Sequence, residues 1–367
     1  MTKLAFFFAS VCISALSVVV LYYFILGGID MVNRKKFSMN TPFLITKESE
    51  CEYIKKSHLK SAVSNSGVIH VISPHVLSPH LIRLQKKSLD LYMESPFEYY
   101  VYGGDAPEGS NFMSMWNYNV NEEIERVAIE VGAQFRKIPR EIHSNRRLLF
   151  PYTGEIQAGT VNSRNADALQ FIFRDAIHFC SNNILMLLDA DMLLVNKINV
   201  TEYIQDYDAV GLQQGRTFEN AGIKVSINYL FTGPSIFDMK RLPGKYDIDF
   251  NWGNSFKIPE YGYSDKITVD TAGYTYKWLI KHNPKVKWLS HGSLTSDKDD
   301  FRLVEVASKW KREISSRYPL LDASAIEVYS KIFLHLRNGC NWMHRNESYR
   351  DANKYVYDFM NEFLPQK

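Results

Sequence analysis

The segment Asn183–Val195, NILMLLDADMLLV, constrains the fold of this chain more than any other. An apolar run of this length, bounded by polar residues, is typical of a β-strand buried on both faces of a sheet. Asp189 and Asp191 interrupt the run, and unpaired charges are too costly to bury in a core. We therefore expect both at the carboxyl end of the strand, where open α/β sheets bind ligands. In an extended chain the two carboxylates would share one side, with Ala190 turned away.

This pair of carboxylates predicts a site for a divalent cation. Hard oxygen ligands suit Mg²⁺ or Mn²⁺, which bind few protein carboxylates and leave coordination positions open for phosphate oxygens. The alternative is a solvated strand end whose carboxylates take part in a salt bridge.

Strands and helices alternate around this segment, which predicts an α/β domain built on a parallel sheet. Ahead of it we expect strands over 67–72, 97–102 and 133–138 and helices over 80–94, 122–131 and 163–180. After it we expect strands over 209–212, 225–231, 286–289 and 331–336, a turn over 232–234, and helices over 268–280, 301–317 and 349–364. The two carboxylates thus follow the third predicted strand, in the middle of the chain.

The N-terminal part of the chain is expected to lie outside this domain. Leu4–Ile29 carries no charge and is long enough to span a bilayer, which favours a transmembrane signal anchor over a cleaved signal peptide. The polar segment Asp30–Ser66 is typical of a stem. The basic cluster Arg34–Lys36 alone would place the domain in the cytosol, whereas the sequons at Asn199 and Asn346 favour the lumen. We expect a single-pass type II membrane protein of the Golgi or endoplasmic reticulum, with its large domain in the lumen.

Composition narrows the classes of partner. The net charge of +3 over 367 residues is too small to indicate a nucleic-acid-binding protein. The four cysteines do not form a disulfide framework and leave the compartment open. The sequence contains no Gly-rich dinucleotide or P-loop motif, no GxSxG and no Cys-x-x-Cys pattern.

The segment LMLLDADMLLV resembles the Asp-x-Asp strand of glycosyltransferases with the A-type fold, which use nucleotide-diphosphate sugars as donors. In that superfamily the two carboxylates hold Mn²⁺ or Mg²⁺ on the donor diphosphate, and the metal neutralises the diphosphate as it leaves. The resemblance implies one Rossmann-like domain over 67–367 with a mixed central sheet. Its nucleotide-sugar half would span 67–195 and its acceptor half 196–367.

The segment Ile332–Trp342, IFLHLRNGCNW, resembles the His-x-x-Gly-x-x-Lys-Pro-Trp region of the retaining family that includes glycogenin. The resemblance implies that His335 is the third metal ligand. Asn341 stands where that family has Lys, the Pro is absent, and one extra residue separates the His from the Gly. Arg337 is a candidate for the missing phosphate contact. His291 is the rival third ligand, and a core histidine at a strand end is the alternative explanation for His335.

Further residues are candidates for contacts with donor and acceptor. Asp270 and Asp265 are candidates for gripping acceptor hydroxyls or for a general base, although Asp270 would equally suit the first turn of a helix. Arg164 starts the helix before the metal strand, where anions are favoured. Ser73 and Asp105 follow the first two strands, where the resemblance places the nucleoside.

The segment Phe231–Asp238 resembles the stretch after the metal strand that returns the chain toward the acceptor. Gly233 would there allow the backbone to approach a sugar closely. An ordinary hairpin turn explains the same residues equally well.

The chain is therefore predicted to be a membrane-anchored, metal-dependent hexosyltransferase. It would move a hexose from a nucleotide-diphosphate sugar to a hydroxyl group of a glycan, glycoprotein or glycolipid. The His335 region favours retention of the anomeric configuration, whereas a carboxylate base such as Asp270 would favour inversion. Two alternatives stay open: a catalytically inactive glycan-binding protein on the same fold, and an Asp-nucleophile phosphatase of the haloacid dehalogenase type, which normally carries Asp-x-Asp on its first strand.

Overall fold

The computed structural model describes residues 67–75, 78–104, 120–139, 141–144, 146–150, 161–220, 223–258, 263–293, 326–336, 360–361 and 364. The chain divides into two compact units, Met1–Lys55 and Lys56–Lys367, and the described residues all belong to the second. The predicted anchor, the predicted stem, Asp105 and Arg337 lie outside them. No helix among the described residues is both long enough and apolar enough to cross a membrane.

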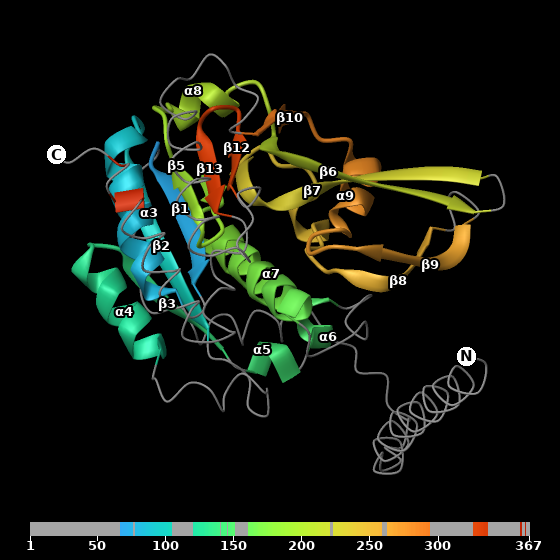
Figure 1. Cartoon of the computed structure of the whole chain (residues 1–367), viewed down its shortest axis with the longest axis horizontal. Helices are drawn as coiled ribbons and strands as arrows, with labels where there is room; N and C mark the ends of the chain where they lie inside the picture. The colour runs from blue at the N-terminus through green and yellow to red at the C-terminus, as the bar shows by residue number, and fades with distance from the viewer. Residues whose placement is uncertain are drawn as a thin grey trace, which may run out of the picture. The chain divides into compact units, whose positions relative to one another are not determined.

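A seven-stranded sheet in the order β10-β6-β7-β4-β1-β2-β3 forms the centre of this unit (Figure 1). Its strands are β1 (Ile69–His75), β2 (Phe97–Gly104), β3 (Gln134–Ile138), β4 (Ile184–Leu187), β6 (Ala209–Asn220), β7 (Ile223–Asp238) and β10 (Val286–Leu289). β1 is parallel to β2 and β4, β2 to β3, and β10 to β6. β7 runs antiparallel to both β4 and β6. The sheet is therefore mixed, as the resemblance implies, and β7 is the strand that departs from the parallel arrangement that alternating strands and helices favour.

Helices cover both faces of this sheet, which explains why most residues of β1, β2 and β4 are buried. The helices are α3 (Pro79–Tyr92), α4 (Val120–Glu130), α5 (Glu141–Ser144), α6 (Arg146–Leu149), α7 (Val161–Phe179), α8 (Val200–Ile204) and α9 (Thr275–His282). On one face Val71 and Met186 pack in a core cluster with residues of α3 and α4. On the other face Ile72 and Leu187 pack with residues of α7 and α9. Alternate strand residues thus serve opposite cores.

The strand predicted to end at the two carboxylates is β4, and the apolar residues that follow Asp191 leave its sheet. β4 ends at Leu187, and the amide of Met192 donates to the carbonyl of Asp189, which closes a turn. The next residues form β5 (Met192–Leu194), which belongs to a second sheet of order β11-β12-β13-β5. The other strands of that sheet are β11 (His291–Ser293), β12 (Ile326–Tyr329) and β13 (Phe333–Leu336). The Asp-Ala-Asp segment therefore lies at a turn between two sheets, and the expectation of an extended backbone there is wrong.

Two further predictions in the second half of the chain are wrong. Residues 263–269 form β9 (Tyr263–Val269), paired with β8 (Gly253–Ile258), so the helix predicted over 268–280 is only α9. The β-branched residues of β9 favour a strand once a partner is present. The turn predicted over 232–234 lies inside β7, because the residues that follow it pair with β4. Residues 301–317 and most of 349–364 lie outside the described part of the chain.

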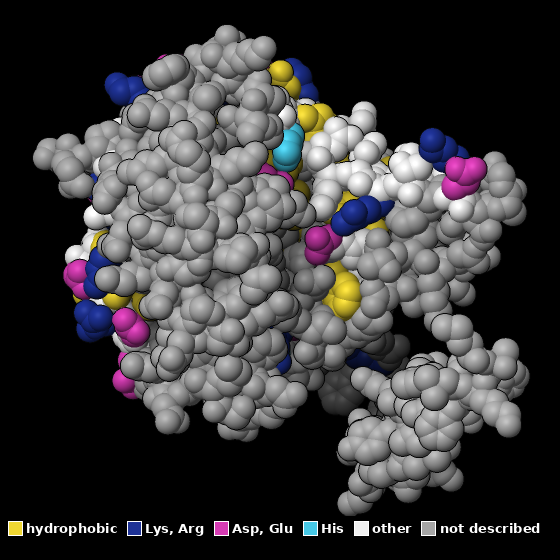
Figure 2. All heavy atoms as spheres, in the orientation of Figure 1, with side chains coloured by type: hydrophobic (Ala, Val, Ile, Leu, Met, Phe, Trp, Pro, Cys, Tyr) yellow, Lys and Arg dark blue, Asp and Glu magenta, His cyan; other side chains and the backbone are white. Residues whose placement is uncertain are grey.

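β6 and β7 form a long hairpin that extends to the right of the central sheet in Figure 1. Figure 2 shows that acidic and basic side chains of the described residues are scattered over the visible face rather than gathered into one patch. This distribution fits the small net charge of the chain.

Candidate active site

The Asp189–Asp191 turn is held by a buried side chain from α3. The amide of Gln85 donates to the carbonyl oxygens of Asp189, at 2.9 Å, and Met192, at 2.8 Å. The hydroxyl of Tyr99 donates in turn to Gln85 Oε1 at 2.6 Å. Gln85 thereby satisfies two carbonyls that the turn leaves without strand partners. No local sequence pattern links Gln85 to the carboxylates, so its role could not be predicted from the sequence.

His335 lies beside Asp191, although the two are far apart in sequence. β13 pairs antiparallel with β5, which sets His335 opposite Met192. The amide of Leu336 donates to the carbonyl of Asp191 at 2.9 Å. His335 Nε2 is 3.6 Å from Asp191 Oδ1, and both residues are buried. The second sheet therefore brings together two of the three residues predicted as metal ligands.

Two residues of β12 hold the other ring nitrogen of His335. Its Nδ1 lies 3.2 Å from Glu327 Oε2 and 3.0 Å from the hydroxyl of Tyr329, which itself donates to Glu327 at 2.6 Å. Burial alone would lower the pKa of His335, but the charge of Asp191 and hydrogen bonding to Asp191 and Glu327 raise it to about 10. Glu327 and Tyr329 thus orient the imidazole so that Nε2 faces Asp191. Neither Glu327 nor Tyr329 was predicted from the sequence.

The surroundings of Asp189 disfavour its charged form. It is half-buried, and its Oδ2 accepts a hydrogen bond of 3.0 Å from the buried hydroxyl of Thr232 in β7. Burial, and then the charge of Asp191, raise the pKa of Asp189 to about 6, against the opposing influence of His335 and Thr232. A second negative charge next to a buried carboxylate disfavours ionisation unless a cation is supplied.

Gly233 is required by the approach of β7 to Asp189. A Cβ at this position would lie 3.0 Å from the amide nitrogen of Asp189 and 3.3 Å from its carboxyl carbon. The close approach predicted for this glycine is therefore to the Asp189 backbone and carboxyl group. Thr232, immediately before it, contacts Asp189 directly and was not predicted from the sequence.

The residues at this turn have the donor types of a divalent-metal site, but they are not arranged as one. Among the described residues, no three His, Cys, Asp or Glu side chains are placed to hold a metal ion as they stand. Asp189 is hydrogen-bonded to Thr232, and His335 is paired with both Asp191 and Glu327. The donor types still fit, because two carboxylates and one imidazole suit Mn²⁺ or Mg²⁺. Metal binding would require a deprotonated imidazole and at least one Asp189 oxygen turned toward Asp191.

His291, the rival ligand, lies on the other side of Glu327. Its side chain is exposed, and its Nε2 is 3.4 Å from Glu327 Oε1. Its ring packs near that of Tyr329, with centroids 5.6 Å apart. The imidazole that pairs with Asp191 is that of His335.

Two other predicted site residues lie on β1 and α7. Ser73 is fully buried in β1, and its hydroxyl has no hydrogen-bond partner among the described residues. The residue before it, Ile72, accepts a hydrogen bond from the amide of Leu188, the residue before Asp189. Arg164 lies in the first turn of α7. Burial lowers the pKa of its guanidinium, and the negative charge of Asp167 partly opposes this shift.

Asp270 follows β9, and its Oδ1 accepts from the amide of Thr271 at 2.8 Å. It is near enough that its negative charge contributes to the raised pKa of Asp189. The alternative of a first-turn helix carboxylate is wrong, because α9 has Tyr274 at its N-cap. Asp265 lies in β9, with its side chain outside the described part of the chain.

Comparisons with known proteins gave similarity at the level of structure alone. No family model matches the chain, and no curated protein matches its sequence. The galactosyltransferase LgtC, solved with donor and acceptor sugar analogues, is 10% identical with a TM-score of 0.34, over 60% of this chain and 72% of that one.

Mouse xyloside xylosyltransferase 1 is 9% identical with a TM-score of 0.34, over 61% of this chain and 85% of its own. The glycosyltransferase GlyE of Streptococcus pneumoniae is 13% identical with a TM-score of 0.32, over 82% and 64%. TM-scores this low do not show that the chain belongs to any of these families.

Proposed function

We propose that this protein is a metal-dependent glycosyltransferase with the A-type fold. It transfers a hexose from a nucleotide-diphosphate sugar to a hydroxyl group of a glycan, glycoprotein or glycolipid. The observation that carries this proposal is the pairing of Asp191 with His335 beside Asp189, at the carboxyl end of β4. Carboxyl ends of parallel strands are where α/β sheets bind ligands.

Asp189, Asp191 and His335 would hold Mn²⁺ or Mg²⁺. The cation, when bound, neutralises charge on the departing diphosphate. The chain's own residues prepare this site. Glu327 orients the imidazole through Nδ1, and Thr232 fixes one oxygen of Asp189. Asp191 raises the pKa of His335 and so favours its protonated form. Binding of the cation would require His335 to lose that proton.

The residues around the metal ligands have separate roles in the proposal. The buried hydroxyl of Ser73 supports a donor contact, because a buried polar group needs a partner. Arg164 and Arg337 are proposed for phosphate, and Asp105 for the nucleoside. Asp270 is proposed for the acceptor hydroxyl, because it lies within electrostatic reach of Asp189.

The proposed stereochemical course is retention. The place of His335 beside Asp191 supports it, because that histidine carries the resemblance to the retaining family. Asp270 is the carboxylate that an inverting reaction would use as its base, with Asp265 as the second candidate. The anomeric configuration of the product decides between the two courses, and an inverted product contradicts retention.

The proposal includes membrane attachment through residues 4–29, with the domain in the lumen of the Golgi or endoplasmic reticulum. The sequon at Asn346 supports it more than that at Asn199. Asn199 caps α8 by accepting from the amide of Glu202 at 3.3 Å, and the hydroxyl of Ser95 donates to it at 3.0 Å. Glycosidase treatment of the expressed chain tests this, since an unchanged electrophoretic mobility would contradict N-glycosylation.

The function is tested with the purified full chain, a panel of nucleotide sugars, Mn²⁺ and neutral glycan acceptors. We expect release of nucleoside diphosphate with one preferred donor, and loss of that release in Asp191→Ala. Binding of glycans without turnover of any donor would favour the inactive binding protein. Release of phosphate from a simple phosphomonoester without a sugar donor would favour the phosphatase.

A further inference from the structure

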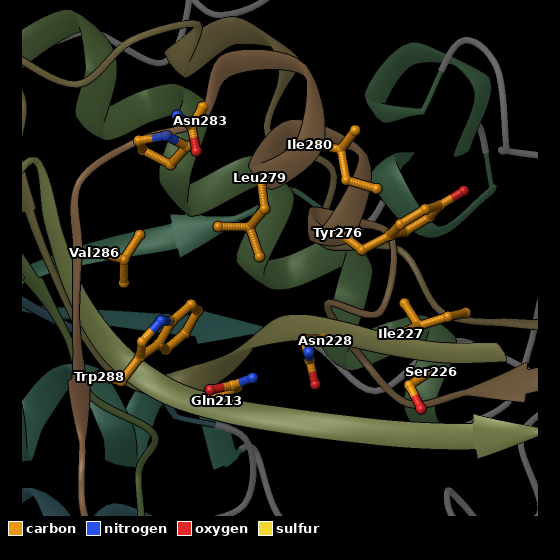
Figure 3. Close-up of a pocket in the computed structure, with 11 residues that line it drawn as sticks. Gln213, Ser226, Ile227, Asn228, Tyr276, Leu279, Ile280, Asn283, Val286 and Trp288 are labelled. Carbon is orange, nitrogen blue, oxygen red and sulfur yellow. The ribbon is translucent and has the colours of Figure 1, made fainter. Parts of the chain in front are cut away.

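A cavity of about 490 Å³ lies between α9 and the strands β6, β7 and β10 (Figure 3). Figure 3 shows Leu279 and Ile280 of α9 on one side and Gln213 and Asn228 of the hairpin on the other, with Trp288 at one end. Its volume is within the range of small-molecule sites. None of its lining residues belongs to the Asp189–Asp191 site.

The lining of this cavity carries no charge. Its residues are apolar, aromatic, amide or hydroxyl side chains, without a single Lys, Arg, His, Asp or Glu. A diphosphate would find no cation there, and an acidic or basic peptide would find no counter-charge. The occupant that complements such a lining is neutral.

The lining nevertheless offers polar groups as well as an apolar surface. The side-chain amides of Gln213, Asn228 and Asn283 make no hydrogen bond to any described residue, and all three residues are exposed. Trp288 is 38% exposed and Ile280 is 59% exposed, so both offer apolar surface to a ligand. Planar amides beside an open aromatic ring suit a ligand with one apolar face and many hydroxyl groups.

A glycine makes room for one of these amides. Asn228 lies opposite Gly215 across the β6–β7 hairpin. A Cβ on Gly215 would lie 3.1 Å from Asn228 Oδ1. Any larger residue at 215 would crowd the amide, so the hairpin leaves the Asn228 side chain free to turn toward a ligand.

We propose that this cavity binds neutral carbohydrate, with a sugar ring stacked on Trp288 and its hydroxyl groups bonded to Asn228 and Gln213. Its assignment to the acceptor glycan rests on the proposed function, whereas the binding of carbohydrate does not. β7 connects the cavity to the Asp189 site: Thr232 is four residue steps along the strand from Asn228, or about 13 Å. The cavity thus binds a part of the glycan away from the hydroxyl that is glycosylated.

Binding is measured by calorimetry with neutral oligosaccharides, for example lactose, maltotriose and N-acetylchitotriose. The full chain carries Asp189→Asn and Asp191→Asn, which removes transfer. We expect at least one probe to bind, and Trp288→Ala to weaken it about tenfold or more, the loss of one stacking contact. Asn228→Ala should weaken it less, and Trp288→Phe should restore part of it. Tyr246→Ala removes a 70% exposed aromatic outside the cavity and should change nothing.

The proposal is overturned if no probe binds, or if Trp288→Ala and Asn228→Ala bind as the parent does. It is also overturned if the cavity takes an acyl chain or a peptide in place of the oligosaccharides. Binding at Trp288 in a chain that turns over no donor would refute the proposed function and leave the carbohydrate site standing. Transfer in which Trp288→Ala leaves the KM of long and short acceptors unchanged would refute the acceptor assignment alone.

Discussion

Asp167 and Asp189 both direct a carboxylate inward within one domain, and their surroundings differ. Asp167 in α7 accepts from Arg146 Nε at 2.6 Å and lies 3.1 Å from His143 Nδ1. Arg146 also donates to Asn251 at 2.6 Å. Asp189 has one hydrogen bond from the neutral Thr232, and its nearest charged neighbours include a second carboxylate, Asp191.

The difference is the one expected between a structural carboxylate and a proposed metal ligand. A guanidinium is always charged, so Asp167 has a permanent cation supplied by the chain. Asp189 and Asp191 share one imidazole, and the pKa of Asp189 is raised to about 6 by burial and by Asp191. A pair of carboxylates left short of positive charge is what a divalent cation would complete.

The largest predicted effect is on turnover. Asp191→Asn keeps the shape of the side chain and removes its charge, so we expect donor turnover to fall about 10³-fold or more. Circular dichroism should show a folded protein. Release of nucleoside diphosphate measures the loss, and activity within about tenfold of the parent would remove Asp191 from the site.

Arg146→Leu should act on stability. It leaves Asp167 buried without its cation, which costs about 3–5 kcal/mol in the free energy of unfolding. Denaturant titration measures this cost with and without Mn²⁺, and the cost should be the same in both. The matched control is Arg126→Leu on α4, where the side chain is 63% exposed and the change should be about 0.5 kcal/mol or less. Equal effects of the two substitutions would contradict the comparison.

Glu327→Gln should act on metal affinity. The amide keeps the size of the side chain but holds His335 less firmly, so we expect Mn²⁺ affinity to fall about 10–100-fold. Titration of Mn²⁺ into the full chain measures it. His291→Ala is the control, because its imidazole lies on the far side of Glu327 and should leave the affinity unchanged. A larger loss in His291→Ala than in Glu327→Gln would make His291 the ligand.

His75 is a fully buried titratable residue that stays neutral in the folded protein at neutral pH. It lies between Ser78 and Tyr99, and burial lowers its pKa to about 4. Below the unfolded pKa of 6.5 the unfolded chain takes up a proton that the folded chain refuses, so stability falls with falling pH down to about 4. We expect about 2 kcal/mol of loss between pH 7.5 and pH 5 from this residue. The free energy of unfolding of His75→Gln should therefore fall by about 2 kcal/mol less than that of the parent over the same pH range. Identical pH profiles of the two proteins would show that His75 does not cause the loss.

Periodic apolar residues were enough to predict α3, α4 and α7 to within a few residues. They did not predict the turn after β4. The apolar residues of β5 would form the same sequence pattern if they continued the first sheet as they do in the second. The helix predicted over 268–280 was wrong in its first half for a similar reason: the partner strand β8 decides the structure of β9.

The site residues were predicted better from the chemical identity of single residues than from apolar periodicity. Asp189 and Asp191 are conspicuous as charges in an apolar run, and the resemblance around His335 led to the histidine that lies beside Asp191. Gln85 and Glu327 contact the site from other elements and carry no local signal. Such residues could be found only from the tertiary structure.

The central claim is that Asp189, Asp191 and His335 hold one divalent cation. Electron paramagnetic resonance of Mn²⁺ titrated into the full chain tests it most directly. We predict one tightly bound Mn²⁺ per chain, lost in Asp189→Asn/Asp191→Asn and kept in Asp247→Asn, which removes a carboxylate already paired with Lys281 and His282. Equal Mn²⁺ binding by the parent and the double variant would contradict the claim.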